Sequence, residues 1–218
     1  MTAFIELGFP QKILLNELQS LEDFNSVKSV LEIGCGIGTN LFHLAKAYPQ
    51  MKISGFDIDA QRILLAQTVL KRFNNVNVFV EDARLMSTLK RYDLVFTSAV
   101  LMLISSKDIQ EVINKIEKIS NNYIIFIEYQ SDSHVKEELL VPDTLKFQYL
   151  RTKLSRFFLL PQMLENKYHY WKRDYEQFIS KDFEIIHKRK ITKSMWSGNW
   201  VRHGYVMTFK KVKSSVRG

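Results

Sequence analysis

The stretch that decides the fold is Val30-Leu-Glu-Ile-Gly-Cys-Gly-Ile-Gly-Thr-Asn40. It continues a short apolar run, residues 29–33, into a turn with glycine at alternate positions 34, 36 and 38, and helical periodicity follows over residues 39–48. Glycine allows a tight turn there and lets a ligand approach the backbone closely. The stretch therefore predicts a strand, a ligand-binding turn and a helix, unless the glycines serve packing alone.

Strand and helix patterns alternate on both sides of this turn. We expect an amphipathic helix before it, over residues 11–24. The pattern after it predicts strands at 52–56, 76–80, 93–96 and 123–128 and helices at 60–72 and 107–120. Two last strands, 183–190 and 205–211, leave no room for a crossover helix and predict an antiparallel hairpin. Together these segments are typical of a doubly wound α/β fold with a mostly parallel, seven-stranded sheet.

A chain of 218 residues suits a single domain, 1–218. We divide it into an N-terminal helix region (1–27), the core of the fold (28–130), a helical cap insertion (131–180) and the C-terminal hairpin (181–218). The cap is expected because the alternation fails after Glu128, where aromatic and charged side chains are mixed and Pro142 and Pro161 interrupt any long element.

Composition excludes several classes of protein. With 46% hydrophobic and 25% charged residues the chain reads as a soluble globular protein. Its longest apolar run, 94–104, falls short of the roughly 20 residues that cross a bilayer, and the N-terminus lacks the pattern of a secretory signal. We expect a cytoplasmic protein without membrane contact.

Cysteine content and net charge limit which metals and macromolecular partners we expect. The single cysteine, Cys35, can form no intramolecular disulfide and supplies no zinc cluster, so no metal is expected. The net charge of +8 would suit an anionic partner, but the basic residues are scattered, so nucleic-acid binding is not expected. The oligomeric state is not indicated.

Two acids follow the next two predicted strands. Asp57 comes 19 residues after Gly38, where doubly wound folds place a carboxylate that accepts from ribose hydroxyls. Asp82 could accept from an exocyclic adenine amine, with the amide of Ala83 facing a ring nitrogen. Either acid could instead cap a helix. Because the carboxyl ends of neighbouring parallel strands share one edge of the sheet, these groups predict an adenosine site.

These motifs, Glu32-Ile-Gly-Cys-Gly-Ile-Gly38 with Asp57 and Asp82, resemble those of class I S-adenosylmethionine-dependent methyltransferases over residues 28–130. Tyr92 to Met102 resembles the fourth motif of that family. The resemblance implies S-adenosylmethionine as cofactor, with its methionine part on the glycine turn and Glu32 ordering that turn or reaching the methionine amine. The implied cofactor-binding residues are Glu32, Gly34, Cys35, Gly36, Gly38, Asn40, Asp57, Ile58, Asp82, Ala83, Thr97, Ser98 and Leu101.

The acceptor site is expected in the cap and in the loop at 196–200, where aromatic and ionisable side chains gather. The candidate substrate-binding residues are Glu128, Tyr129, Trp171, Arg173, Trp196 and Trp200. His169 is the candidate general base, with a structural role as the alternative. Short matches at 96–104, 127–129 and 172–175 resemble methylases associated with sugar-acid biosynthesis for bacterial surface glycans.

We therefore expect methyl transfer to an oxygen or nitrogen of a polar small molecule, with a sugar or sugar-acid precursor as the narrower expectation. The alternatives are a methyltransferase acting on RNA or protein and a noncatalytic cofactor-binding protein. A dehydrogenase fits poorly, because its fingerprint wants glycine or alanine where this chain has Thr39. We expect Cys35 to be a structural thiol rather than a nucleophile.

Overall fold

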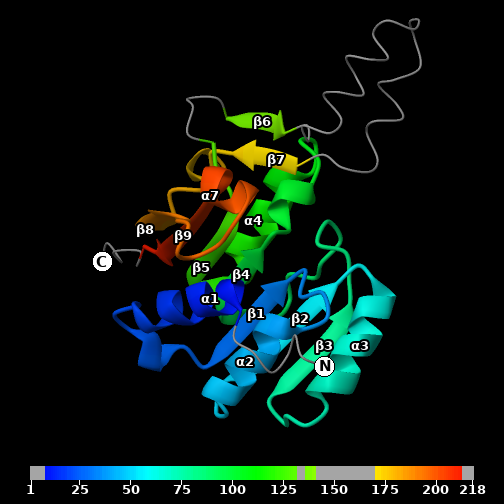
Figure 1. The fold of residues 1–218 in the computed structure, drawn as a ribbon. Coiled ribbons are helices and arrows are strands. Elements are labelled where there is room, and N and C mark those ends of the chain that lie inside the picture. Colours follow the sequence, from blue (N-terminus) through cyan, green and yellow to red (C-terminus); the bar gives the residue numbers. More distant parts are fainter. Residues whose placement is uncertain (1–7, 132–135, 141–169, 213–218) are drawn as a thin grey trace, which may run out of the picture.

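The computed structural model describes residues 8–131, 136–140 and 170–212 (Figure 1). Their main element is a seven-stranded sheet in the order β3-β2-β1-β4-β5-β9-β8. Its first five strands are parallel, and β9 runs antiparallel to both β5 and β8. The strands are β1 (Ser29–Ile33), β2 (Lys52–Asp57), β3 (Val76–Val80), β4 (Tyr92–Ser98), β5 (Ser120–Tyr129), β8 (Phe183–Lys190) and β9 (Gly204–Lys211). The predicted doubly wound fold and its C-terminal hairpin are thus confirmed.

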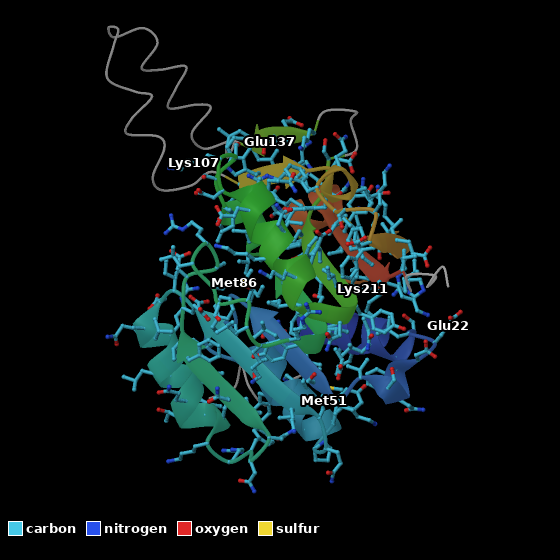
Figure 2. The ribbon with its side chains drawn as sticks, turned by 180° about the vertical axis from the view of Figure 1, so that it is seen from behind. Glu22, Met51, Met86, Lys107, Glu137 and Lys211 are labelled. Carbon is cyan, nitrogen blue, oxygen red and sulfur yellow. The ribbon has the colours of Figure 1, made fainter. Side chains whose placement is uncertain are left out.

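Helices cover both faces of this sheet. One hydrophobic cluster packs α1 (Phe9–Gln19), α2 (Thr39–Ala47) and α3 (Ala60–Leu70) against one face. The other joins α4 (Ile109–Ile119) to the opposite face, which Figure 2 shows with α4 lying across it. Strand side chains alternate between the two clusters, as Val30 and Leu31 do on β1, because successive residues of a strand point to opposite faces.

Local sequence explains where the helices begin. The Asp59 carboxylate accepts from the backbone N–H groups of Gln61 and Arg62, which caps α3 at its first residue. Pro10 stands in the first turn of α1, where its missing N–H costs nothing. That helix begins and ends earlier than expected, and a short 3-10 helix, η2 (Phe24–Ser26), follows it.

The described part of the expected cap differs from the helical prediction. It forms a two-stranded antiparallel sheet, β6 (Glu137–Leu140) with β7 (Tyr170–Arg173), followed by the 3-10 helix η4 (Tyr175–Gln177). The two strands pair Glu137 with Arg173, far apart in sequence, and four residues are too few to show a period of two. The remaining cap residues, 132–135 and 141–169, lie outside the described residues.

Two short helices near the carboxyl ends of the strands were also not foreseen. The 3-10 helix η3 (Leu101–Leu103) follows β4, and α7 (Asn199–His203) lies between β8 and β9. No helix within the described ranges is both long and apolar enough to cross a membrane.

Candidate functional site

A cavity of about 410 Å³ opens beside the glycine turn, where β1 and β4 end. The chain order reverses between these two strands, and open α/β sheets bind their ligands at such a switch point. Turn, helix and loop residues together line it: Pro10, Gln11, Glu32, Gly34, Cys35, Gly36, Ile37, Thr39, Asn40, Arg62, Ser98, Ala99 and Trp196.

The three positions of the turn favour glycine for different physical reasons. All have positive φ, with values of 71°, 53° and 80° at Gly34, Gly36 and Gly38. A Cβ on Gly34 would lie 2.3 Å from the Val100 side chain, and one on Gly38 would lie 2.7 Å from Leu70. A Cβ on Gly36 would meet nothing within 4 Å. Packing therefore requires the outer two glycines, whereas the middle one leaves bare backbone facing open space.

Glu32 at the base of the cavity carries a carboxylate that is only half satisfied. Its side chain is buried, and Oε1 accepts a hydrogen bond from Asn40 Nδ2 at 2.6 Å. Asn40 Oδ1 in turn accepts from Gln11 Nε2 at 2.8 Å, so α1 is tied into the site. The other oxygen, Oε2, is buried without a hydrogen-bond partner among the described residues. Burial, with the nearby charge of Asp57, raises the pKa of Glu32 to about 8.

Asp57 holds the glycine turn from β2. Its Oδ2 accepts from the Gly36 N–H at 2.8 Å and its Oδ1 from the Asp59 N–H at 2.9 Å. Asp57 is not among the residues that line the cavity. The next side chain, Ile58, is 63% exposed, so an apolar surface lies free at the end of β2.

Asp82 is engaged by a neighbour. Arg84 donates from Nη2 to Asp82 Oδ2 at 2.5 Å and from Nε to both carboxylate oxygens at 3.0 Å, and this pairing lowers the pKa of Asp82. Ala83 is buried between them. Neither Asp82 nor Ala83 lines the cavity.

Glu128, expected to contact the substrate, binds the protein's own backbone. Its side chain is fully buried at the end of β5, and Oε1 accepts from Thr97 Oγ1 at 2.9 Å and from the N–H groups of Val100 and Leu101 at 2.9 and 3.1 Å. Oε2 accepts from the Met102 N–H at 3.3 Å. Burial outweighs these bonds and raises the pKa of Glu128 to about 7. These four hydrogen bonds all join Glu128 to groups of the protein, and Thr97 and Leu101 belong to this same arrangement. A contact of Glu128 with substrate stays a prediction.

Arg173, the other charged residue that we expected to contact substrate, is also hydrogen-bonded within the protein. It is fully buried, and it donates from Nη1 to the Leu101 carbonyl at 2.7 Å and from Nη2 to the Ile104 carbonyl at 2.6 Å. Its Nε donates to Glu137 Oε2 at 3.0 Å, and its guanidinium lies 5.0 Å from the Trp171 ring centroid. The guanidinium therefore faces the η3 backbone, and Trp171 packs against it outside the cavity lining.

Aromatic side chains gather beside Trp196, which lines the cavity. The Trp196 and Trp200 rings stack with centroids 4.4 Å apart, and the Tyr129 ring meets Trp200 edge-on at 4.8 Å. Tyr170 and His203 lie 6.0 and 5.9 Å from Tyr129, which completes what we call the aromatic cluster. Burial raises the pKa of Tyr129 to about 12, so its phenol stays neutral. The candidate base His169 lies outside the described residues.

Residues 30–122 match a family model described as a methyltransferase domain. A malonyl-[acyl-carrier protein] O-methyltransferase of Ilyobacter polytropus is 32% identical over 87 residues, which are 40% of this chain and 34% of that protein. The chain thus spans about a third of the length of this relative. Magnesium protoporphyrin IX methyltransferase from Synechocystis, solved with bound S-adenosylhomocysteine, has a TM-score of 0.62 at 16% identity and covers 94% of this chain and 84% of its own.

The N-methyltransferase NodS from Bradyrhizobium japonicum, also solved with S-adenosylhomocysteine, gives a TM-score of 0.62 at 14% identity, over 93% of this chain and 87% of its own. Residues 30–122 of this chain thus match a methyltransferase domain, and the sheet around them has the fold of these solved methyltransferases. At such low identity the solved structures establish the fold, and the acceptors in their names are those of other proteins.

Some residues that line the cavity were not predicted from the sequence. Ile37 and Thr39 lie within the quoted motif, so they could have been included. Pro10, Gln11 and Arg62 could not, because only tertiary packing brings α1 and the start of α3 to the turn. Ala99 was not predicted either, because its unusual feature is a positive φ of 62°, which the residue type alanine does not indicate. Among the residues that the structure describes, no group of three His, Cys, Asp or Glu side chains could hold a metal ion.

Proposed function

We propose that this protein transfers the methyl group of S-adenosylmethionine to an oxygen or nitrogen of a polar small molecule. The observation that carries the proposal is the unpartnered Oε2 of Glu32 in a cavity at the switch point of a methyltransferase-type sheet. A buried carboxylate oxygen without a donor costs free energy, and the ammonium of a methionine moiety would satisfy it.

The rest of the site fits the remaining parts of the cofactor. The open backbone at Gly36 suits the close approach of the methionine part, and Asp57 stands beside it for the ribose. The exposed Ile58 supplies an apolar surface for one face of adenine. Asp82 and Ala83 stay proposed adenine contacts, with the carboxylate shared by Arg84. When bound, the cofactor supplies a methyl carbon attached to a positively charged sulfur.

The chain's own contribution is to align the acceptor and to exclude water. Trp196 forms part of the cavity wall, and its stack on Trp200 fixes the ring plane. An indole face suits the flat, CH-rich face of a sugar ring, which supports a sugar or sugar acid as the narrower acceptor class. We propose Trp196, Trp200 and Tyr129 as the acceptor wall. His169 remains the proposed base.

Isothermal titration calorimetry with S-adenosylmethionine and S-adenosylhomocysteine tests the cofactor. We expect the folded wild type to bind both and Glu32→Gln to bind them about 10- to 100-fold more weakly, since the lost partner is charged. Asp57→Ala should cost about 1–3 kcal/mol of binding free energy. Absence of binding to the folded wild type at millimolar ligand would exclude the proposal.

Turnover separates the acceptor classes. Formation of S-adenosylhomocysteine can be followed with panels of sugars, sugar acids and small amines, and in parallel arms with RNA and with unmodified proteins. Turnover confined to a small-molecule arm supports the proposal, and turnover confined to RNA or protein contradicts it. Cofactor binding without turnover in any arm favours a noncatalytic binding protein.

A further inference from the structure

Two buried ionisable side chains, those of Glu128 and Arg173, hold the backbone at the end of β4 and after it, residues 98–104, which we call the 98–104 loop. Glu128 accepts from three consecutive N–H groups on one side of it, those of Val100, Leu101 and Met102. Arg173 donates to carbonyls of the same turn, at Leu101 and Ile104. Leu101 is thus held through both its N–H and its carbonyl group.

The cost of this arrangement indicates a precise geometry. Glu128 and Arg173 are both fully buried, and removing an ionised group from water costs several kcal/mol unless hydrogen bonds replace the lost hydration. Apolar packing would fill the same volume at less cost, but it would not fix individual peptide groups. Glu137 on β6, which is labelled in Figure 2, accepts a hydrogen bond from Arg173 Nε through its Oε2 at 3.0 Å.

The 98–104 loop reaches the cavity directly. Ser98 and Ala99 line the cavity, and Ala99 holds a positive φ of 62° while its N–H donates to the Ile127 carbonyl at 3.0 Å. The side chain of Val100 occupies the space that a Cβ on Gly34 would need. A displacement of this loop would therefore move one cavity wall and the packing above the glycine turn together.

We infer that Glu128 and Arg173 are positioning residues that hold the 98–104 loop against Gly34, so that the small β6–β7 sheet sets the geometry of the cofactor site. This inference rests on the proposed function. It reassigns two side chains that the sequence suggested as substrate contacts. It also makes β7, which carries Arg173, an energetic partner of a site that its residues do not line.

Calorimetry with S-adenosylhomocysteine on the full chain tests the inference. We expect Arg173→Met to weaken binding about tenfold, the usual size of a coupling between separate sites. Arg173→Lys should recover only part of this loss, because an ammonium keeps the charge but lacks the planar fork that reaches two carbonyls. The matched control is Lys172→Met on the same strand, which breaks the 2.8 Å pair with Glu138 and should change affinity less than twofold.

Hydrogen exchange separates positioning from loss of stability. In Arg173→Met the amides of Val100, Leu101 and Met102 should exchange faster, while those of β1 keep their protection. Phe183→Leu, in the buried core at the start of β8 where Phe183 pairs with Lys211 of β9, serves as a destabilised control that should retain its affinity.

The outcomes distinguish the two proposals. Failure of the wild type to bind S-adenosylhomocysteine overturns the proposed function and the inference with it. Wild-type binding that Arg173→Met leaves unchanged overturns the inference alone. So does a loss of affinity that Phe183→Leu reproduces at equal stability, or unchanged exchange at residues 100–102.

Discussion

The two walls of the cavity are built in different ways. The core of the glycine-turn wall lies between β1 and the end of β2 and is joined by hydrogen bonds such as Gly36 N–H to Asp57 and Asn40 to Glu32. The helix α1 adds Gln11 to this wall. The opposite wall is the 98–104 loop with Trp196, held by residues from β5, β7 and α7. Most residues of the first wall therefore come from one continuous stretch of sequence, whereas the second wall depends on contacts between distant segments.

Glycine substitutions, which test the contact between the two walls, should give the largest change in the free energy of unfolding. Gly34→Ala adds a methyl 2.3 Å from Val100 at a φ of 71°, so the two walls collide. We expect a loss of about 3 kcal/mol in the free energy of unfolding, from combined overpacking and left-handed strain. Gly36→Ala carries the strain alone, with a φ of 53° and open space around the new methyl, and should cost about 1 kcal/mol. Equal losses in denaturant titrations would show that the walls are not in tight contact there.

The pH dependence of ligand affinity probes the glycine-turn wall. The pKa of Glu32 is raised to about 8, so the carboxyl is protonated near pH 6, and an ammonium ligand requires it ionised. Affinity for S-adenosylhomocysteine should therefore rise with pH between 6 and 7.5, by at most about tenfold per unit. Calorimetry in two buffers of different ionisation enthalpy should show proton release on binding. Glu32→Gln should bind with a flat profile, and a flat wild-type profile would contradict this role.

The same raised pKa sets a sign for stability. Because the folded-state pKa of Glu32 lies above its ordinary value of 4.5, ionisation favours the unfolded chain. The ligand-free protein should thus lose stability as pH rises from about 4.5 to 8. Glu32→Gln should remove that part of the slope in thermal unfolding.

The smallest effect on ligand binding is expected from a change in the opposite wall. Trp200→Ala removes the ring that stacks on Trp196 and meets Tyr129, a loss of about 0.5–1.5 kcal/mol beyond buried area. Once an acceptor is known, its Michaelis constant should rise several-fold while cofactor affinity stays within twofold. Tyr170→Phe, at the edge of the aromatic cluster, is the control and should leave both unchanged. An equal loss of cofactor affinity in Trp200→Ala would mean that the two walls do not act separately.

How far the sequence predicts each wall follows from the range of its contacts. Gly34, Gly36 and Asn40 were found because they stand in one unbroken motif next to a strand end. Gln11 was not predicted as a site residue, because its hydrogen bond to Asn40 spans 29 residues and no sequence pattern in α1 indicates it. Glu128 was predicted from its place at a strand end and Arg173 from the aromatic and ionisable residues of the expected cap. A charged side chain that binds substrate and one that binds backbone look alike in sequence.

By itself the sequence determined the order of strands and helices and the ligand-binding turn, because hydrophobic period and glycine placement act over a few neighbouring residues. Only the tertiary structure decided that Glu128 and Arg173 form hydrogen bonds with the backbone of the 98–104 loop. It alone also decided that β6 and β7 pair as strands. Those outcomes depend on which distant groups burial brings within hydrogen-bonding distance. No local pattern of residues encodes that choice, since the partners of a buried charge are fixed only when the core closes around it.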